Sequence, residues 1–198
     1  MRSIPTFIMA ITVAFACNTL LVCAADPPAS GDQSKKDEIK IPLKDFKFKP
    51  PASVSDPDSV FVFNEDEGRL CFYTNGPAEA KFKLPTDGDW DVIVSASGDI
   101  AVGVPQTTAN GKKEVNIPPN FQLGFDGKNF GKEITLKSDD QKDYKIVVPL
   151  KAGEHVISVA FTNDTYDPDG KFDSNLYLHG VKLRPHQPDE PKKDDAKK

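Results

Sequence analysis

The chain has 198 residues, of which 38% are hydrophobic and 28% charged, and its formal net charge is -5. This length fits one ordinary domain with tails, and the 13 Phe, 4 Tyr and 1 Trp are too many for a disordered chain. The acidic balance argues against nucleic acid or an anionic membrane surface as the main partner, because both bind clustered Lys and Arg.

The N-terminal segment, residues 1–25, has the pattern of a secretory signal peptide. Arg2 precedes an apolar run, which ends in the small residues Cys23, Ala24 and Ala25. We expect cleavage near Ala24 or Ala25, which would make the mature protein secreted, periplasmic or bound at the cell surface, with no membrane segment. The alternatives are an uncleaved anchor, because the apolar stretch is nearly long enough to span a bilayer, and a lipid-modified cysteine.

Cysteine usage limits how the mature domain can be stabilised. Cleavage of the signal would remove Cys17 and Cys23 and leave Cys71 alone, so no internal disulfide can form. The domain then needs a full hydrophobic core or a bound ion. Cys71 lies in the apolar run 70–73, where we expect it to be a small buried residue.

Two polar segments flank the predicted domain. Residues 26–52 are rich in Pro, Lys and Asp and have little apolar content, so we predict a flexible linker there. Residues 186–198 have almost nothing to bury and are predicted to be a disordered charged tail. The domain itself is therefore placed at residues 53–185.

Within these limits, short apolar runs alternate with turns rich in Gly, Pro, Asn and Asp. We predict strands at 60–63, 70–73, 80–84, 90–94, 100–104, 121–125, 134–136, 144–148, 155–161 and 176–183. Asp126-Gly127 is typical of a two-residue hairpin turn, and residues 150–154 predict a second hairpin. About ten short strands with no sustained helical period indicate an all-β fold, an antiparallel β-sandwich of the jelly-roll type.

Alternation within the strands predicts which side chains form the core. In the strand 155–161, Ile157, Val159 and Phe161 share one face, which we expect to line the core because successive strand residues point to opposite faces. Trp90 begins another apolar strand and is also predicted to be buried.

The loop between the last two predicted strands concentrates oxygen ligands. It contains Asp164, Asp167, Asp169 and Asp173, with only Lys171 to offset their charge. A hard divalent cation would relieve the repulsion, and Ca²⁺ takes 6–8 oxygen ligands at such sites. Soft ligands for zinc are absent from the loop. The alternative is a solvated turn in which Asp acts as a turn former.

Two motifs around this loop resemble the calcium-dependent xylan-binding class of carbohydrate-binding modules. The first motif is LKAGEHVISVAFTND at 150–164, and the second is DSNLYL at 173–178. Weaker similarity extends to residues 90–98 and 123–128. The resemblance implies a jelly-roll sandwich that holds Ca²⁺ in its last loop and binds a polysaccharide.

The resemblance also implies roles for individual residues. Asp164, Asp173 and the backbone carbonyl of Phe172 would bind the metal, and vicinal hydroxyls of a sugar would complete its coordination shell. Tyr166 and Phe172 are the aromatic candidates for stacking on a sugar ring, with packing within the loop as the alternative. The expected supporting residues of the loop are Asn163, Asp167, Asp169 and Asn175. Ser174 stands where the family usually has Arg, so metal binding carries over more safely than xylan binding.

No motif for nucleophilic or metal-dependent hydrolysis appears in the sequence. His155 and His179 are expected at solvent-facing strand positions, and His186 in the tail. We therefore predict a non-enzyme, a secreted calcium-dependent carbohydrate-binding module that recognises a xylan-like or related polysaccharide. The alternative is a calcium-stabilised structural or protein-interaction β-sandwich at the cell surface, and a small hydrolase is a third class that turnover would reveal.

Overall fold

A computed structural model describes residues 38–109 and 111–188 of the chain. The chain divides into two units, residues 1–31 and 32–198, and all described residues belong to the second unit. The predicted signal peptide, the linker up to residue 37 and the tail from residue 189 lie outside the described residues. Within the described part, no helix is long and apolar enough to cross a membrane.

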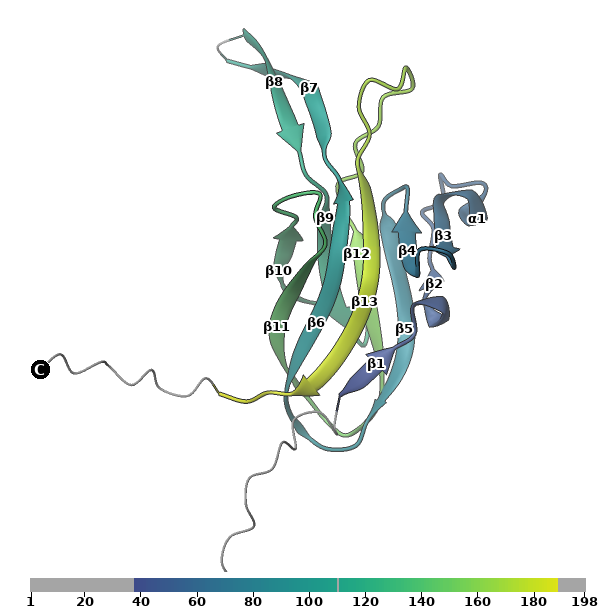
Figure 1. The fold of residues 1–198 in the computed structure, drawn as a ribbon, viewed down its shortest axis with the longest axis vertical. Helices are drawn as coiled ribbons and strands as arrows, with labels where there is room; N and C mark the ends of the chain where they lie inside the picture. Colours follow the sequence, from purple (N-terminus) through teal and green to yellow (C-terminus); the bar gives the residue numbers. More distant parts are fainter. Residues whose placement is uncertain (1–37, 110, 189–198) are drawn as a thin grey trace, which may run out of the picture. The chain divides into compact units, whose positions relative to one another are not determined.

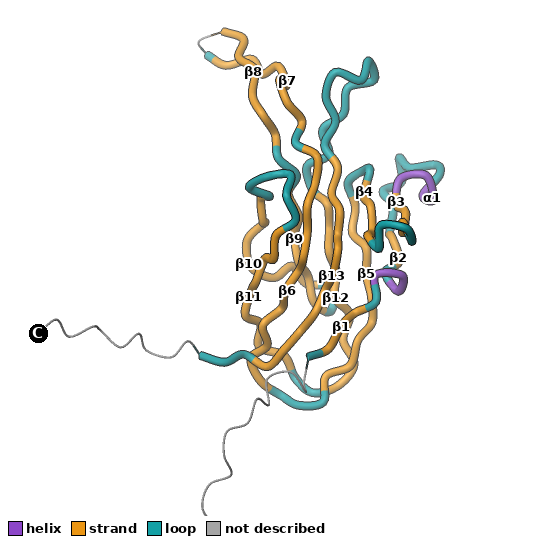
Figure 2. The backbone as a smooth tube through the Cα atoms, in the orientation of Figure 1, coloured by secondary structure: helices purple, strands orange, loops and turns teal. Residues whose placement is uncertain are grey.

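The described residues form short strands with little helix (Figures 1 and 2). The strands are β1 (Ile39–Ile41), β2 (Lys47–Phe48), β3 (Phe61–Asn64), β4 (Arg69–Phe72), β5 (Gly76–Leu84), β6 (Gly88–Asp99), β7 (Ala101–Thr108), β8 (Gly111–Ile117), β9 (Asn120–Phe125), β10 (Lys128–Thr135), β11 (Lys142–Leu150), β12 (Gly153–Phe161) and β13 (Asn175–Pro185). The helical elements are a 3-10 turn, Leu43–Asp45, and α1 (Pro57–Val60). Every predicted strand overlaps one of these strands.

The strands assemble into two antiparallel sheets, as a jelly-roll sandwich requires, and the predicted fold class is confirmed. Sheet A has the order β11-β6-β13-β4-β3, and β1 also pairs with β13. Sheet B has the order β10-β9-β12-β5-β2, and β7 pairs only with β8 in a separate ribbon. The Asp126-Gly127 hairpin is confirmed between β9 and β10, because both residues adopt the positive φ angles, 52° and 77°, that this turn type needs.

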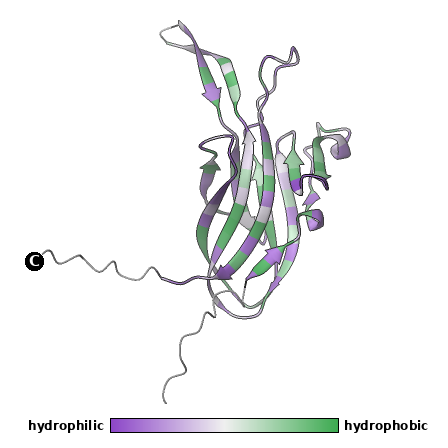
Figure 3. Ribbon diagram, viewed as in Figure 1, coloured by the Kyte–Doolittle hydropathy of each residue, from purple (hydrophilic) through white to green (hydrophobic). Residues whose placement is uncertain are grey.

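The core lies between the two sheets and is filled by the inward-facing side chains of both. Ile157, Val159 and Phe161 are buried, as predicted from the alternation along β12, and Trp90 and Cys71 are buried too. Figure 3 shows hydrophobic residues recurring along the strands, whereas the loop between β12 and β13 is largely hydrophilic. The core therefore occupies the body of the sandwich and leaves its end loops polar.

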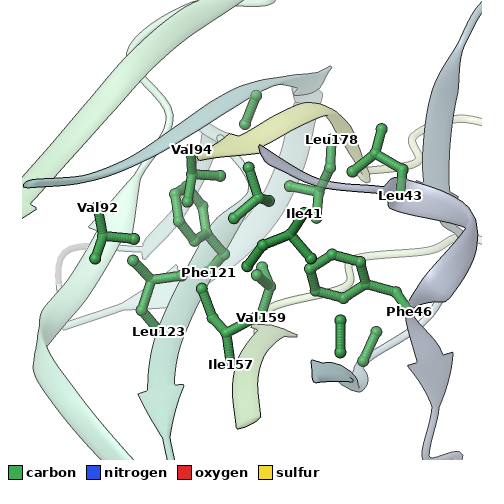
Figure 4. Packing of buried hydrophobic residues seen from close by; sticks show 14 of the residues in the cluster. Ile41, Leu43, Phe46, Val92, Val94, Phe121, Leu123, Ile157, Val159 and Leu178 are labelled. Atoms are coloured by element: carbon green, nitrogen blue, oxygen red, sulfur yellow. The ribbon is translucent and has the colours of Figure 1, made fainter. Parts of the chain in front are cut away.

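The predicted linker is wrong over residues 39–48, which are part of the sandwich. Ile41, Leu43 and Phe46 are buried in the core, and Figure 4 shows Ile41 and Phe46 beside Val159. β1 pairs with β13, and β2 pairs with β5, so this segment joins both sheets. The segment looked like a linker because its few apolar residues are separated by Lys, Asp and Pro, yet three well-placed side chains suffice to anchor it.

The second predicted hairpin, at 150–154, is also wrong. β11 pairs with β6 in sheet A, whereas β12 pairs with β5 and β9 in sheet B. The short connection therefore crosses from one sheet to the other and does not join neighbouring strands. Asp87 fixes this crossing, since its carboxylate accepts hydrogen bonds from the backbone N–H of Ala152 at 2.7 Å and from Lys151 Nζ at 2.9 Å.

His186, one residue beyond the predicted end of the domain at residue 185, still contacts the sandwich. Asp91 is buried on β6, and its carboxylate contacts His186 Nδ1 at 2.7 Å, Arg184 Nε at 3.1 Å and Lys145 Nζ at 3.5 Å. Burial works to raise the pKa of Asp91, but the bonds from His186 and Arg184 and the charge of Lys145 outweigh it and lower the pKa. His186 is therefore an anchored residue, not part of a free tail.

His155 was expected to face solvent, but its side chain is only 11% exposed. Its Nδ1 lies 2.8 Å from Asp126 Oδ2, and its Nε2 lies 2.8 Å from the carbonyl oxygen of Lys151. Because both partners are acceptors, only the imidazolium form of His155 can donate to both at once. Burial alone would lower the pKa of His155, but these two bonds outweigh it and raise the pKa.

This arrangement predicts a pH-dependent contribution to stability. The folded pKa of His155 is raised, so its contribution is complete below the ordinary value of about 6.5 and is lost as pH rises through the folded pKa. The difference in Tm between the wild type and His155→Ala should therefore shrink as pH rises above about 6.5 and through the raised folded pKa. Thermal melts across this range check the prediction, and a difference that does not change with pH would contradict it.

Candidate functional site at the acidic loop

The acidic loop, residues 162–174, joins the two sheets at one end of the sandwich. It leaves sheet B after Phe161 at the end of β12 and enters sheet A at Asn175, the first residue of β13. Asn175 is paired with Asp99, the last residue of β6, so the loop and the β7–β8 ribbon start from the same end of the sandwich (Figures 1 and 2). Asp164 thus follows one sheet, and Asp173 precedes the other.

Hydrogen bonds close the base of the loop into a narrow neck. The backbone N–H of Thr165 donates to Ser174 Oγ at 2.9 Å, and the backbone N–H of Ser174 donates to the Thr165 carbonyl at 2.9 Å. A single antiparallel bridge between Tyr166 and Asp173 continues this pairing. Ser174 is fully buried, and its small hydroxyl closes the neck.

Asp164 lies at the neck in a setting that disfavours its charge. It is half-buried, and its Oδ1 has no hydrogen-bond partner among the described residues. Burial and then the negative charge of Asp173 raise the pKa of Asp164 to about 6, against an opposing hydrogen bond from Thr74. The backbone N–H of Asp164 donates to Asn75 Oδ1 at 2.7 Å. This bond fixes the main chain from which the Asp164 carboxylate extends.

Asn175 connects Asp173 of the loop to Asp99 at the end of β6. It is 6% exposed, and its Nδ2 donates to Asp173 Oδ2 and to Asp99 Oδ2, each at 3.0 Å. Tyr177 donates its phenolic hydrogen to the same Asp99 oxygen, while burial and that bond raise the pKa of Tyr177. Asn175 Oδ1 is buried without a partner in the described structure. Asn175 thus orients Asp173 and leaves one buried oxygen free.

Close backbone packing supports this geometry at Gly98. A Cβ atom at Gly98 would lie only 2.3 Å from the carbonyl oxygen of Asn175 and 2.8 Å from the Pro119 side chain. Only glycine therefore lets β13 begin so close to β6 at this point. Asn163 fixes the other side of the loop, because its side chain bonds the backbone of Asn120 and the carbonyl of Pro118.

Of the remaining predicted residues, Asp167 and Asp169 belong to the tip of the loop, whereas Tyr166 and Phe172 lie between the tip and the neck. Asp167 acts as a turn former, since its Oδ1 accepts from the backbone N–H of Asp169 at 3.3 Å, and Asp169 pairs with Lys171 at 3.2 Å. The Asp167 backbone N–H donates to the Phe172 carbonyl at 3.0 Å. Tyr166 is 64% exposed, whereas Phe172 is partly buried. Only two of the four loop carboxylates, Asp164 and Asp173, thus interact at the neck.

The donor set at the neck suits a hard cation. Over 38–109 and 111–188, no three His, Cys, Asp or Glu side chains converge as a metal site, so carboxylates alone do not build one. The neck instead offers the carboxylates of Asp164 and Asp173. The Phe172 carbonyl lies one residue before Asp173 and keeps a second lone pair beside its hydrogen bond from the Asp167 N–H. Such all-oxygen ligands are those that Ca²⁺ prefers. The residues present therefore fit the ion that the resemblance implies.

Sequence reasoning missed two residues of this site, Asp99 and Tyr177. The signal for Tyr177 was present, because it lies two residues after Asn175 on β13 and so shares its face. Asp99 could be found only from the pairing of β6 with β13, which places residues 76 positions apart in direct contact.

The chain is similar to several solved structures of carbohydrate-binding modules. A CBM36-1 domain of a multidomain xylanase from the hindgut metagenome of Trinervitermes trinervoides is 13% identical, with a TM-score of 0.45 and coverage of 76% of this chain and 98% of that chain. A family 35 module from Clostridium thermocellum is 12% identical, with a TM-score of 0.44 and coverage of 75% and 98%. A CBM36 module in complex with calcium and xylotriose is 11% identical, with a TM-score of 0.43 and coverage of 74% and 96%.

The sequence itself matches a family model. No curated protein matches the chain. The model of the Ca-dependent, xylan-binding carbohydrate-binding modules CBM60 matches residues 91–197, which is more than half of the chain and includes most of β6, the acidic loop and β13. The protein therefore belongs to the CBM60 family of carbohydrate-binding modules.

Proposed function

We propose that this protein is a non-catalytic, secreted module that binds a xylan-like polysaccharide through a calcium ion held at the neck of the acidic loop. The observation that carries the proposal is the pair of buried oxygens without partners, Asp164 Oδ1 and Asn175 Oδ1, beside the carboxylate of Asp173. Buried polar atoms are rarely left unpaired. A cation would coordinate the unpaired Asp164 oxygen and would also neutralise the repulsion between the two carboxylates.

Each residue at the neck would have a distinct task. Asp164 and Asp173 would supply charge, the Phe172 carbonyl would supply a neutral oxygen, and Asn175 would hold Asp173 in position. Bound Ca²⁺ supplies coordination sites that two vicinal sugar hydroxyls can occupy in place of water. Tyr166, exposed beside the neck, would offer a flat apolar surface to the sugar ring.

The proposed location outside the cell rests on the sequence of residues 1–25. This segment has a positive charge, an apolar run and a small-residue end, the order of a secretory signal. A module that binds plant-type polysaccharide would meet its ligand only outside the cell, so the two parts of the proposal agree.

The test is calorimetric titration of the protein with soluble xylan, in excess Ca²⁺ and in EGTA, together with thermal melts. We expect binding only with Ca²⁺, and a metal at 100 times its Kd should stabilise the fold by about 2.7 kcal/mol. Binding that persists in EGTA would contradict the calcium site. A Ca²⁺-dependent melt without binding to xylan or related glycans would favour a structural role, and release of reducing sugar would contradict a non-catalytic one.

A further inference from the structure

Sheet A has an outer face that carries a row of polar side chains on β6, of which Ser97 is buried, Ser95 partly buried and Asp99 exposed. Asp99, Ser97 and Ser95 alternate along β6 and point to this face, away from the core. Ser97 is 7% exposed, and its Oγ lies 2.8 Å from His179 Nε2. Gln141 Nε2 donates to Ser95 Oγ at 2.8 Å. Hydroxyl, amide and imidazole groups thus line the face in a row that begins at the neck.

This row leads into a pocket of about 380 Å³. Ser95, Gln141, Asp143 and His179 provide its polar groups, and Ile93 and Val181 are among its apolar residues. The register places Asp143 opposite Ser95. Polar groups around an apolar patch are the combination that sugars require, because a pyranose ring has hydroxyl edges and apolar C–H faces.

His179 is in the right form for such a ligand. Burial, and then the charge of Arg69, lower the pKa of His179, so its imidazole is neutral at pH 7. Its Nε2 is engaged with Ser97, which leaves Nδ1 outside that bond. A neutral imidazole can both donate and accept, as hydroxyl groups do.

The charges beside the pocket also fit a neutral ligand. Lys40 and Lys182 line the pocket, and both lie close to the Glu38 carboxylate, with Nζ–Oε distances of 3.9 Å and 3.4 Å. Asp143 adds a second negative charge at the wall. Two cations and two carboxylates balance, so an ionic ligand would gain little here over an uncharged polysaccharide.

Tyr177 lies on β13 between Asn175 at the neck and His179 at the pocket, and it is 8% exposed. Tyr177, which bonds Asp99 of the site, packs edge-on against Tyr73 with their ring centroids 6.4 Å apart, and the Arg69 guanidinium lies 4.1 Å from the Tyr177 ring centroid. Tyr73 is 40% exposed. Asp99 and Ser95 are four residues apart on β6, about 14 Å at about 3.4 Å per residue, a distance that an oligosaccharide can bridge.

We propose that the polysaccharide held at the neck continues across the outer face of sheet A, and that the pocket at Ser95, Gln141, Asp143 and His179 is a distal subsite for another sugar of the same chain. This inference rests on the proposed function, since the neck provides the first contact. Under this proposal, contacts on sheet A make the affinity increase with the length of the oligosaccharide. The calcium-dependent contact at the loop is separate from this increase.

The experiment compares xylotriose and xylohexaose by calorimetry in excess Ca²⁺, with wild-type protein, Gln141→Ala and Asp143→Ala. Both residues are exposed, so neither substitution should disturb the fold. We expect each to weaken xylohexaose binding about fivefold, the value of one hydrogen bond, and to leave xylotriose binding unchanged. Lys83→Ala, an exposed outward change on β5 of sheet B, is the matched control and should change neither affinity.

The outcomes separate the two proposals. If xylotriose binds with Ca²⁺ but the variants bind xylohexaose as the wild type does, the distal subsite is wrong and the proposed function stands. If the variants weaken both sugars equally, these residues do not form a separate subsite, and the inference is again overturned. If neither sugar binds the wild type, the proposed function fails and the distal subsite fails with it.

Discussion

Replacing Asp164 by Asn is expected to stabilise the metal-free protein at neutral pH while abolishing its response to calcium. The folded pKa of Asp164 is raised to about 6 by burial and by Asp173. For an acid with a raised folded pKa, the native state binds more protons than the unfolded state between the two pKa values, so stability falls as pH rises through them. At pH 7 the ionised carboxylate is therefore a cost, which the isosteric amide removes.

Thermal melts in EGTA and in Ca²⁺ test both halves of this prediction. In EGTA at pH 7, Asp164→Asn should melt a few degrees above the wild type, and near pH 4 this advantage should vanish. In Ca²⁺ the wild type should gain stability and the variant should not, and xylan binding should be lost with it. Asp169→Asn, an exposed change in the tip of the same loop, is the control. A variant that still responds to Ca²⁺ would contradict the assigned ligand.

The second large effect is expected far from the site, in the segment that resembles a linker. Phe46 is buried in the core between the sheets, and removing a buried Phe side chain costs about 3–5 kcal/mol, because the transfer free energy is lost and a cavity remains. Most domains are stable by only about 5–15 kcal/mol. Phe46→Ala should therefore remove a large fraction of the free energy of unfolding.

Urea denaturation measures this loss as a lower transition midpoint with an unchanged slope. Lys44→Ala is the matched control, because Lys44 lies two residues away in the same turn and is exposed. The control should unfold close to the wild type. If Phe46→Ala also did so, residues 39–48 would not be a working part of the core.

Strand positions could be read from this sequence because period-two alternation survives wherever one face of a strand is buried. β12 shows why, since Ile157, Val159 and Phe161 alternate with smaller outward residues. β1 and β2 were missed because strands of three and two residues are too short to show a period. The β8 strand was missed for a different reason, because five of its seven residues are polar or glycine and it lies in a ribbon outside the core.

The site could be predicted only as far as it is local in sequence. Asp164 and Asp173 were found because they flank one loop, and Asn175 because it shares a motif with Asp173. Contacts between distant segments left no trace in the sequence, as with Asn75, whose side chain holds the backbone of Asp164 from 89 residues away. The connection at 150–154 was predicted wrongly for the same reason. A short turn has the same sequence pattern whether the two strands that it joins are paired or belong to different sheets.

The closed neck of the loop has a consequence for protein engineering. Because the bonds between Thr165 and Ser174 seal the base, the tip at 167–171 is a nearly autonomous insert whose length and composition can vary without moving the strands below it. Libraries could therefore be displayed at these five positions while the neck stays intact. In such a scaffold, the residues introduced at the tip would select the new ligand. The neck beneath them would keep the loop fixed to the sandwich.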